Sequence, residues 1–336
     1  MIRTRFTRRD ALRAAAVVAV ATIAVVGLVD PASAQSEYPN RPIRLVVGYS
    51  AGGPTDILAR VLGQDIGTTL GQTVVVENKP GANGNIGTET VQHAAPDGYT
   101  LLMNTISHNV NPLLQPSVMK YDPIKDFTPV SQVAVLPQII VAGGSGPFKT
   151  LGDLIAKAKS APDAVNYGSA GVGGSAHLAA ALLQQRSGTR MNHVPFRGNA
   201  PALTEVMAGR VDFMFYPMVG VAEHVSGGKL RVLAVTTAKR HSDYPDVPTL
   251  AELGFPGFED YAQPIGFIAP AGLPMPIAAT LDKAIAAALE KPAMQARLKS
   301  LGAEVQRRDP AQYREWLAQD RSRWEQLIRS ANIKAE

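Results

Sequence analysis

Apolar residues along the chain alternate between short continuous runs and helix-spaced stripes. The run at 42–47 ends in a glycine loop at 48–53 and continues as a helical pattern that begins at Pro54. Two further runs, at 73–77 and 99–103, are separated by a second helix-like segment. This β-α-β-α-β order predicts a parallel sheet, because strands joined through helices run in one direction. The loops at the carboxyl ends of such strands face one crevice, where ligands bind in open α/β sheets.

The loops after these strands are rich in small polar side chains. We expect these side chains to face the crevice, where they can exchange hydrogen bonds with a ligand. The residues concerned are Tyr49, Ser50, Asn83, Asn104, Thr105, Ser107, His108 and Asn109.

A second unit of similar pattern begins after the Gly- and Pro-rich segment 143–147. Thr150 and Asp153 form a capping-box pattern, which predicts a helix at 150–159. Strands are expected at 165–167, 191–196, 211–216, 230–236 and 265–269, and helices through residue 183 and at 199–208, 274–290, 292–301 and 310–331. We therefore predict an α/β protein of two lobes, formed by residues 35–134 plus 265–336 and by residues 135–264. Trp316 and Trp324 recur at helical spacing in the last helix and are interpreted as packing residues.

The glycine loop at 48–53 has features of an anion-binding loop. Gly52 and Gly53 are expected to let the backbone turn sharply, and Pro54 suits a first helical position. Asp56 lies in the first turn, where the helix dipole favours an acid. The backbone N–H groups at a helix N-terminus lack partners and can bind an anion. A plain strand-to-helix turn remains an alternative explanation of this stretch.

The loop at 168–175 repeats these features in the second unit, with Ser169, Ser175 and two glycines before a helix. Two such loops imply one site that holds an anion from two sides. Residues 171–176 also match the dinucleotide pattern G-x-G-x-x-A. That pattern requires an acid about 20 positions further on, at the end of the next strand, whereas the first acid here is Glu205 in the next helix. A dinucleotide site is therefore disfavoured.

The N-terminus has the pattern of a secretory signal peptide at 1–34. Five Arg residues precede an apolar segment at 14–29, and Ala32-Ser33-Ala34 fits the cleavage pattern. We predict cleavage after Ala34 and a periplasmic location. Arg8 and Arg9 resemble a twin-arginine signal, and Sec export remains the alternative.

Composition excludes several classes of function. Without residues 1–34, the chain keeps 28 of its 33 Lys and Arg and 26 of its 28 Asp and Glu, so its net charge falls from +5 to +2. Aromatic residues are 6% of the chain and no long Lys/Arg block follows the signal, so no nucleic-acid partner is expected. The absence of Cys removes thiolate zinc sites, thiol catalysis and disulfides.

An exported enzyme is the alternative to a binding protein. The chain has no G-x-S-x-G elbow and no H-E-x-x-H motif, and its six His residues show no ligand spacing. His177 could act as a general base, but its place in a first helical turn favours capping or packing. Asp56 could also be a base, although dipole compensation explains it equally well. We predict no catalytic residue, no metal and no cofactor.

Several ordered motifs resemble those of one receptor family. They are YSAGGxxD at 49–56, ENKPGANG at 77–84, PDGYTL at 96–101, YGSxGxGGSxHL at 167–178 and VPFRGxxPA at 194–202. The chain resembles the Bug-type extracytoplasmic solute receptors of tripartite tricarboxylate transporters, the TctC family, over nearly all of its length after the signal. The resemblance implies a two-lobed, type II-like periplasmic binding protein, with a mainly parallel sheet flanked by helices in each lobe. It also implies a monomer that closes on a small carboxylate in the cleft between the lobes and delivers it to membrane subunits, without catalysis.

The resemblance also implies which residues hold the ligand. The family's two carboxylate-holding loops fall on 49–56 and 169–175. The implied ligand-binding residues are Tyr49, Ser50, Gly52, Gly53, Asp56, Asn83, Ser107, Ser169, Gly173, Gly174, Ser175, Phe196, Gly198 and Pro217. Ala51 stands where Pro is frequent in the family, and Arg197 where Lys is frequent. Arg197 either faces solvent or offers a guanidinium fork to a second carboxylate, so the identity of the acid stays open.

Overall fold

A computed structural model describes residues 38–258, 261–330 and 333. The predicted signal peptide lies outside the described residues, so its cleavage site stays a prediction. Residues 1–40 and 41–336 form separate units, and the fold below is that of the second unit. In the described residues no helix is both long enough and apolar enough to span a membrane.

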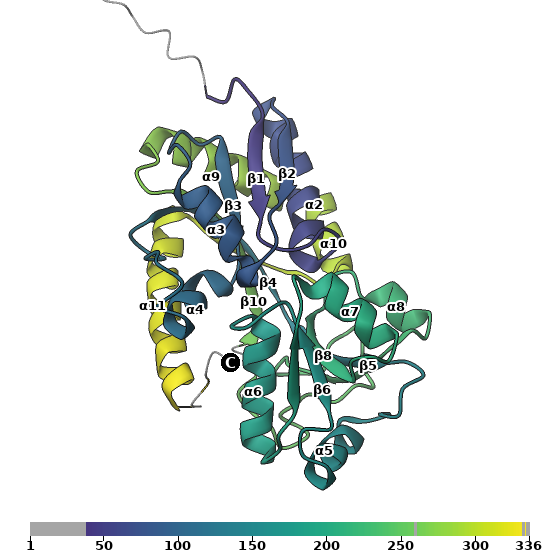
Figure 1. The fold of residues 1–336 in the computed structure, drawn as a ribbon. Coiled ribbons are helices and arrows are strands. Elements are labelled where there is room, and N and C mark those ends of the chain that lie inside the picture. Colours follow the sequence, from purple (N-terminus) through teal and green to yellow (C-terminus); the bar gives the residue numbers. More distant parts are fainter. Residues whose placement is uncertain (1–37, 259–260, 331–332, 334–336) are drawn as a thin grey trace, which may run out of the picture. The chain divides into compact units, whose positions relative to one another are not determined.

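The second unit contains two sheets (Figure 1). The first sheet has the strand order β11-β4-β10-β3-β1-β2, and the second has the order β7-β6-β8-β5-β9. The strands of the first sheet are β1 Ile43–Val47, β2 Val74–Asn78, β3 Thr100–Asn104, β4 Phe127–Leu136, β10 Gln263–Pro270 and β11 Glu304–Arg308. Those of the second sheet are β5 Gln138–Gly143, β6 Asn166–Ser169, β7 Asn192–Pro195, β8 Phe213–Pro217 and β9 Leu230–Val235.

The α/β class and the two-sheet arrangement are confirmed, but both sheets are mixed. Strands β1, β2 and β3 pair in parallel, as do β6, β7 and β8. In contrast, β10 is antiparallel to β3 and β4, and β5 is antiparallel to β8 and β9. The expectation of mainly parallel sheets is therefore wrong. The reason is that β4, β5 and β10 connect the two sheets directly, without a helical crossover that would keep their direction.

The predicted helices are present with boundaries shifted by a few residues. They are α2 Pro54–Leu70, α3 Asn85–Gln92, α5 Leu151–Ser160, α6 Ser175–Ser187, α7 Asn199–Met207, α9 Met275–Glu290, α10 Pro292–Ser300 and α11 Pro310–Ser330. Thr150 and Asp153 form the predicted capping box. The sequence did not predict α4 Ser107–Leu114, α8 Ala222–Ser226, the 3-10 turn η1 Ala82–Gly84 or strand β11.

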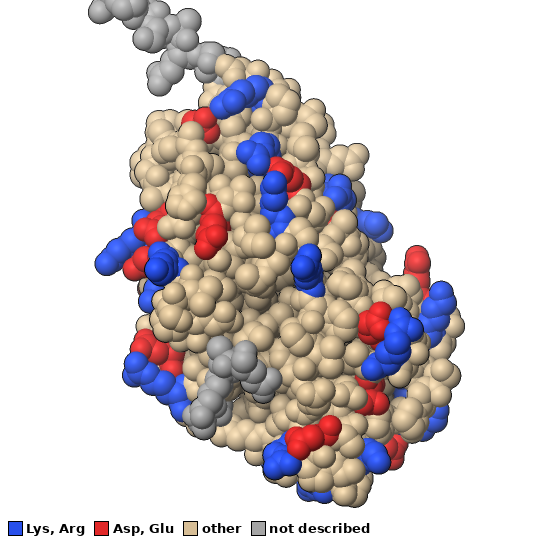
Figure 2. All heavy atoms as spheres, viewed as in Figure 1, with Lys and Arg blue, Asp and Glu red and all other residues tan. Residues whose placement is uncertain are grey.

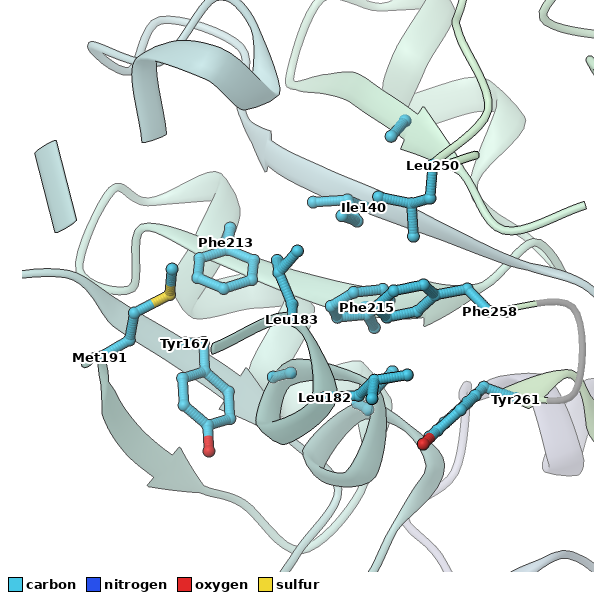
Figure 3. Close-up of a cluster of buried hydrophobic side chains, with 14 of the residues drawn as sticks. Ile140, Tyr167, Leu182, Leu183, Met191, Phe213, Phe215, Leu250, Phe258 and Tyr261 are labelled. Carbon is cyan, nitrogen blue, oxygen red and sulfur yellow. The ribbon is translucent and has the colours of Figure 1, made fainter. Parts of the chain in front are cut away.

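A cluster of buried aromatic side chains packs against the second sheet. Phe213 and Phe215 of β8 are fully buried, and the ring of Phe215 stacks on Phe258 with 5.9 Å between centroids (Figure 3). Burial of one such ring contributes about 1.5–3 kcal/mol. The same cluster includes Trp324 from α11, which runs beside α4 in Figure 1. Trp316 packs on a second cluster around Tyr313, so both Trp residues are packing residues, as predicted.

The chain leaves the first sheet between β4 and β5 and returns to it in β10. The lobe limits, residues 35–134 plus 265–336 and residues 135–264, stay a prediction. On the face shown in Figure 2, basic and acidic side chains are interspersed.

Candidate functional site

The first glycine loop is fixed by Asp56. Its carboxylate accepts hydrogen bonds from Gly52 N at 2.9 Å, from Asn78 Nδ2 at 2.9 Å and from Arg60. Burial alone would raise the pKa of Asp56, but these hydrogen bonds outweigh it and hold the pKa below its usual value. Asp56 therefore holds the loop in shape, and its contact with a ligand stays a prediction.

Of the adjacent Gly52 and Gly53 in this loop, only Gly52 has a backbone conformation that needs glycine. Gly52 has φ +78°, in the left-handed region. Gly53 is the N-cap of α2 with φ −81°, which any residue adopts, so the expectation that it too is required for the turn is wrong. A Cβ on Gly53 would lie 3.8 Å from the Ala200 nitrogen, so the start of α2 lies next to the start of α7.

The second glycine loop is held by its own serine and histidines. Ser169 Oγ accepts from Gly171 N at 3.0 Å and lies 2.6 Å from His193 Nε2. Gly173 N donates to His177 Nδ1 at 3.2 Å, so His177 ties the loop to the first turn of α6, a structural role of the capping or packing kind expected of it. Ser169 is fully buried, so its hydroxyl stabilises the loop, and a ligand contact from it stays a prediction.

The two loops meet across the two sheets. Asn83, from the first sheet's side, lies against the second loop, because a Cβ on Gly174 would be 3.0 Å from Asn83 Oδ1. Ser50 Oγ donates to the Arg197 carbonyl at 2.8 Å, beside Gly198. The N-termini of α2, α6 and α7 therefore converge, and none of their first free amides (Thr55, Asp56, Ser175, Ala176, Asn199 and Ala200) donates to another group in the described residues. Such a group of amides can bind an anion.

A network of hydroxyl and side-chain amide groups holds the Asn83 side chain in place. Tyr49 OH donates to Ser107 Oγ at 2.7 Å, and Ser107 Oγ donates to Asn83 Oδ1 at 3.2 Å. Asn111 Oδ1 accepts a hydrogen bond from Asn83 Nδ2 at 2.9 Å, and Asn111 Nδ2 donates to the backbone carbonyl of Asn83. Burial raises the pKa of Tyr49, so its hydroxyl stays protonated and can donate. The predicted residues Tyr49, Asn83 and Ser107 thus form one unit.

Three of the polar residues expected in the crevice form hydrogen bonds with other parts of the chain. Asn104 Nδ2 donates to Tyr313 OH, His108 Nε2 lies 2.9 Å from the Pro123 carbonyl, and Asn109 Nδ2 donates to Asp320 at 2.9 Å. His108 and Asn109 belong to α4, whose helical geometry turns their side chains away from Ser107. Asn104 and His108 still line one small pocket with Tyr49, Asn83 and Ser107, and contact of these side chains with a ligand stays a prediction.

The remaining predicted residues lie around the meeting point of the loops. Phe196 N donates to the Ser169 carbonyl, and the Phe196 side chain packs on the second sheet's core. Pro217 ends β8, and the loop that follows it touches α2, because a Cβ on Gly220 would lie 2.9 Å from Ile57 Cδ1. The Arg197 side chain is exposed. Contact of any of these residues with a ligand stays a prediction.

Thr55 and Gln263 are two site residues that sequence analysis missed. Gln263, at the start of β10, accepts from Ser175 Oγ at 3.2 Å and donates to Thr55 Oγ1 at 3.3 Å. The position of Thr55 after Pro54 could have drawn attention to it, since it is the second residue of a helix that starts a candidate anion site. Nothing local marks Gln263, because its role depends on where β10 lies.

In the described residues no group of three His, Asp or Glu side chains is arranged to hold a metal ion. The groups gathered at the candidate site are backbone amides, hydroxyls and side-chain amides.

Lowering the pH should destabilise the protein in part through His177. Burial lowers the pKa of His177 from 6.5 to about 4, so the folded state keeps it neutral. The unfolded chain binds the extra proton, so this stabilisation is complete above about pH 6.5 and is lost as the pH falls toward 4. In denaturant unfolding at pH 7 and pH 5, His177→Gln should lose less stability than the wild type, by up to about 1.4 kcal/mol per pH unit. Equal losses in both proteins would contradict this assignment.

The comparison with protein families agrees with this architecture. Residues 58–333 match the model of TctC, the tripartite tricarboxylate transporter family receptor. The chain belongs to the TctC family. The resemblance seen in the sequence motifs is therefore confirmed.

Relatives in this family match nearly the whole chain. BugT of Bordetella pertussis is 37% identical over 315 residues, which cover 93% of this chain and 95% of BugT. A UPF0065 protein from the tcbD-tcbE intergenic region of Pseudomonas sp. strain P51 is 35% identical and covers 89% of this chain and 88% of its own length.

Solved structures of similar proteins share the fold. The periplasmic binding protein BugD has a TM-score of 0.85 and 36% identity, covering 89% of this TctC chain and 100% of its own. MatC of Rhodopseudomonas palustris, with bound malate, has a TM-score of 0.82 and 35% identity, covering 87% and 100%. A second R. palustris protein, with adipate, has a TM-score of 0.84 and 33% identity, covering 89% and 99%.

Proposed function

We propose that this TctC protein is a periplasmic receptor that binds a small carboxylate, with aliphatic dicarboxylates as the ligand class, and delivers it to the membrane subunits of a tripartite tricarboxylate transporter. The convergence of the N-termini of α2, α6 and α7 carries the proposal, because their first amides have no acceptor among the described residues and each helix start carries about half a positive charge. The malate and adipate in the relatives support the ligand class.

The geometry favours a receptor over an exported enzyme that acts on a carboxylated molecule. The pair Ser169 and His193, 2.6 Å apart, has the spacing of a nucleophile and a base. However, burial and the neighbouring His177 lower the pKa of His193 to about 3, which makes it a weak base. The Ser169 hydroxyl is buried and hydrogen-bonded to the Gly171 amide. The pair therefore holds the second loop, and we propose binding without turnover by a monomer.

A ligand screen tests this function. Protein exported and purified from the periplasm of a bacterial host should gain thermal stability with one or more dicarboxylic acids, including malate and adipate. At a ligand concentration 100 times Kd, binding stabilises by about 2.7 kcal/mol, or about 5 °C in Tm for a domain of this size. The corresponding diamides should give no shift, since they lack the charge that the helix N-termini favour.

Mass spectrometry of the acid after incubation separates the two candidate functions. Recovery of unchanged acid, together with the shift in Tm, is expected of a receptor. Conversion of any acid would support the enzyme instead, and the absence of a shift with every acid would contradict carboxylate binding.

A further inference from the structure

Gln263 bridges two of the converging helices with a single side chain. It is the first residue of β10, where the chain re-enters the first sheet opposite Leu136 of β4. Its Oε1 accepts from the hydroxyl of Ser175 at 3.2 Å, and its Nε2 donates to the hydroxyl of Thr55 at 3.3 Å. All three side chains are buried, with exposed fractions of 5% or less. The amide thus connects the start of α2 to the start of α6.

The bridge leaves donors without acceptors. The Thr55 hydroxyl hydrogen and the second Nε2 hydrogen of Gln263 have no acceptor among the residues that the structure describes. Leaving a buried donor unsatisfied costs about 1–3 kcal/mol. These donors lie beside the unpaired amides of α2 and α6, so one acceptor with two oxygens, such as a carboxylate, can satisfy both kinds of group.

The Gln263 side chain is neutral, although a charged side chain of the same shape exists. Glutamate has the same shape and would accept from the Thr55 and Ser175 hydroxyls, and both helix N-termini would stabilise its charge. A glutamate here would therefore occupy the positive potential that a bound anion needs. A neutral amide joins the two helices and leaves that potential for a ligand.

We propose that Gln263 contacts the bound carboxylate and that its neutral side chain makes the site selective for an anion. This inference rests on the proposed carboxylate binding and assigns a specificity-determining residue to it. Gln263 donates one N–H to the ligand and keeps the starts of α2 and α6 in register around it.

Three substitutions at this position separate charge from shape. Gln263→Glu adds a charge at constant shape, Gln263→Met keeps the length without polar atoms, and Gln263→Ala removes the side chain. Gln306→Glu, on the exposed strand β11, is the matched control for a change of one unit in net charge. Tm without ligand and calorimetric titration with adipate and malate at pH 7.5 are measured for all five proteins.

The expected order of the Tm values and affinities of these variants differs from that of a general loss of stability. Without ligand, Gln263→Glu should have a higher Tm than Gln263→Met, because both helix N-termini stabilise the new charge. With adipate or malate, Gln263→Met and Gln263→Ala should lose about tenfold in affinity, at the low end of the range for one hydrogen bond to a charged group, and Gln263→Glu should lose more than that because its charge also repels the acid. Gln306→Glu should match the wild type in both measurements.

Failure of the inference and failure of the proposed function give different results. If the wild type binds neither malate nor adipate nor any other acid of the screen, the proposed carboxylate binding is wrong. If, in addition, the Tm of Gln263→Glu is lower than that of Gln263→Met, the placement of Gln263 between two helix N-termini is overturned as well. If the wild type binds an acid and Gln263→Glu binds it equally well, the specificity role of Gln263 is overturned while the receptor function stands.

Discussion

Replacing Gly198 with alanine is expected to weaken carboxylate binding about 100-fold, which corresponds to about 2.7 kcal/mol. Gly198 is the N-cap of α7 and has φ +149° and ψ 169°, a conformation that almost only glycine adopts. A Cβ at this position would lie 3.0 Å from the Ser50 nitrogen and 3.1 Å from Ser50 Oγ. The added methyl group would therefore push the first glycine loop away from the start of α7, and the amides around the ligand would no longer converge.

A second glycine, just beyond the other end of α7, provides the control. Gly209, after α7, also has a positive φ, +73°, but a Cβ there would meet nothing within 4 Å. Gly209→Ala should cost about 1 kcal/mol of stability through backbone strain and leave affinity unchanged. Calorimetric titration with the best acid from the screen and denaturant unfolding of both variants separate the two effects. Equal affinities for Gly198→Ala and the wild type would show that the approach of Ser50 to Gly198 is not needed for binding.

The glycines of the site show how much of it the sequence alone could predict. The strand-glycine-helix pattern predicted both glycine loops, because it is local in the sequence, whereas Gly198 was placed among the ligand-binding residues only by the family resemblance. The sequence could not say which glycine has an unusual conformation. Gly52 has a positive φ and its N–H donates to Asp56, whereas Gly53 has an extended conformation, and no local pattern in the sequence distinguishes the two.

Features that depend on distant partners were not predictable in the same way. Strand β11, Glu304–Arg308, is polar and exposed, so its strand conformation comes from pairing with β4 and not from an apolar pattern. Gln263 precedes Pro264, and the apolar strand pattern begins only at Ile265, so the start of β10 was placed too late. Its bridge between Thr55 and Ser175 joins residues that are far apart in the chain.

Replacing Trp324 with alanine is expected to cost about 3–5 kcal/mol of stability, the usual range for truncation of a buried aromatic side chain. Trp324 is 1% exposed, and its ring meets that of Tyr261 edge-on with 5.1 Å between centroids. Its Nε1 donates to Asp320 at 3.1 Å. Burial raises the pKa of Asp320, and removal of the indole would take one hydrogen-bond donor from this buried carboxylate. Denaturant unfolding followed by circular dichroism measures the loss.

The same variant tests whether Trp324 packs the core or stacks on a ligand. None of the described contacts of Trp324 involves the two glycine loops, so the folded variant should bind the best acid within about twofold of the wild type. Trp324→Phe keeps an aromatic ring without the N–H and should recover most of the stability, with about 1 kcal/mol still lost at Asp320. A variant that stays as stable as the wild type but loses affinity would instead assign the indole to the ligand. Because a domain of this kind is stable by only about 5–15 kcal/mol, the expected loss is large enough to make the two outcomes clearly distinct.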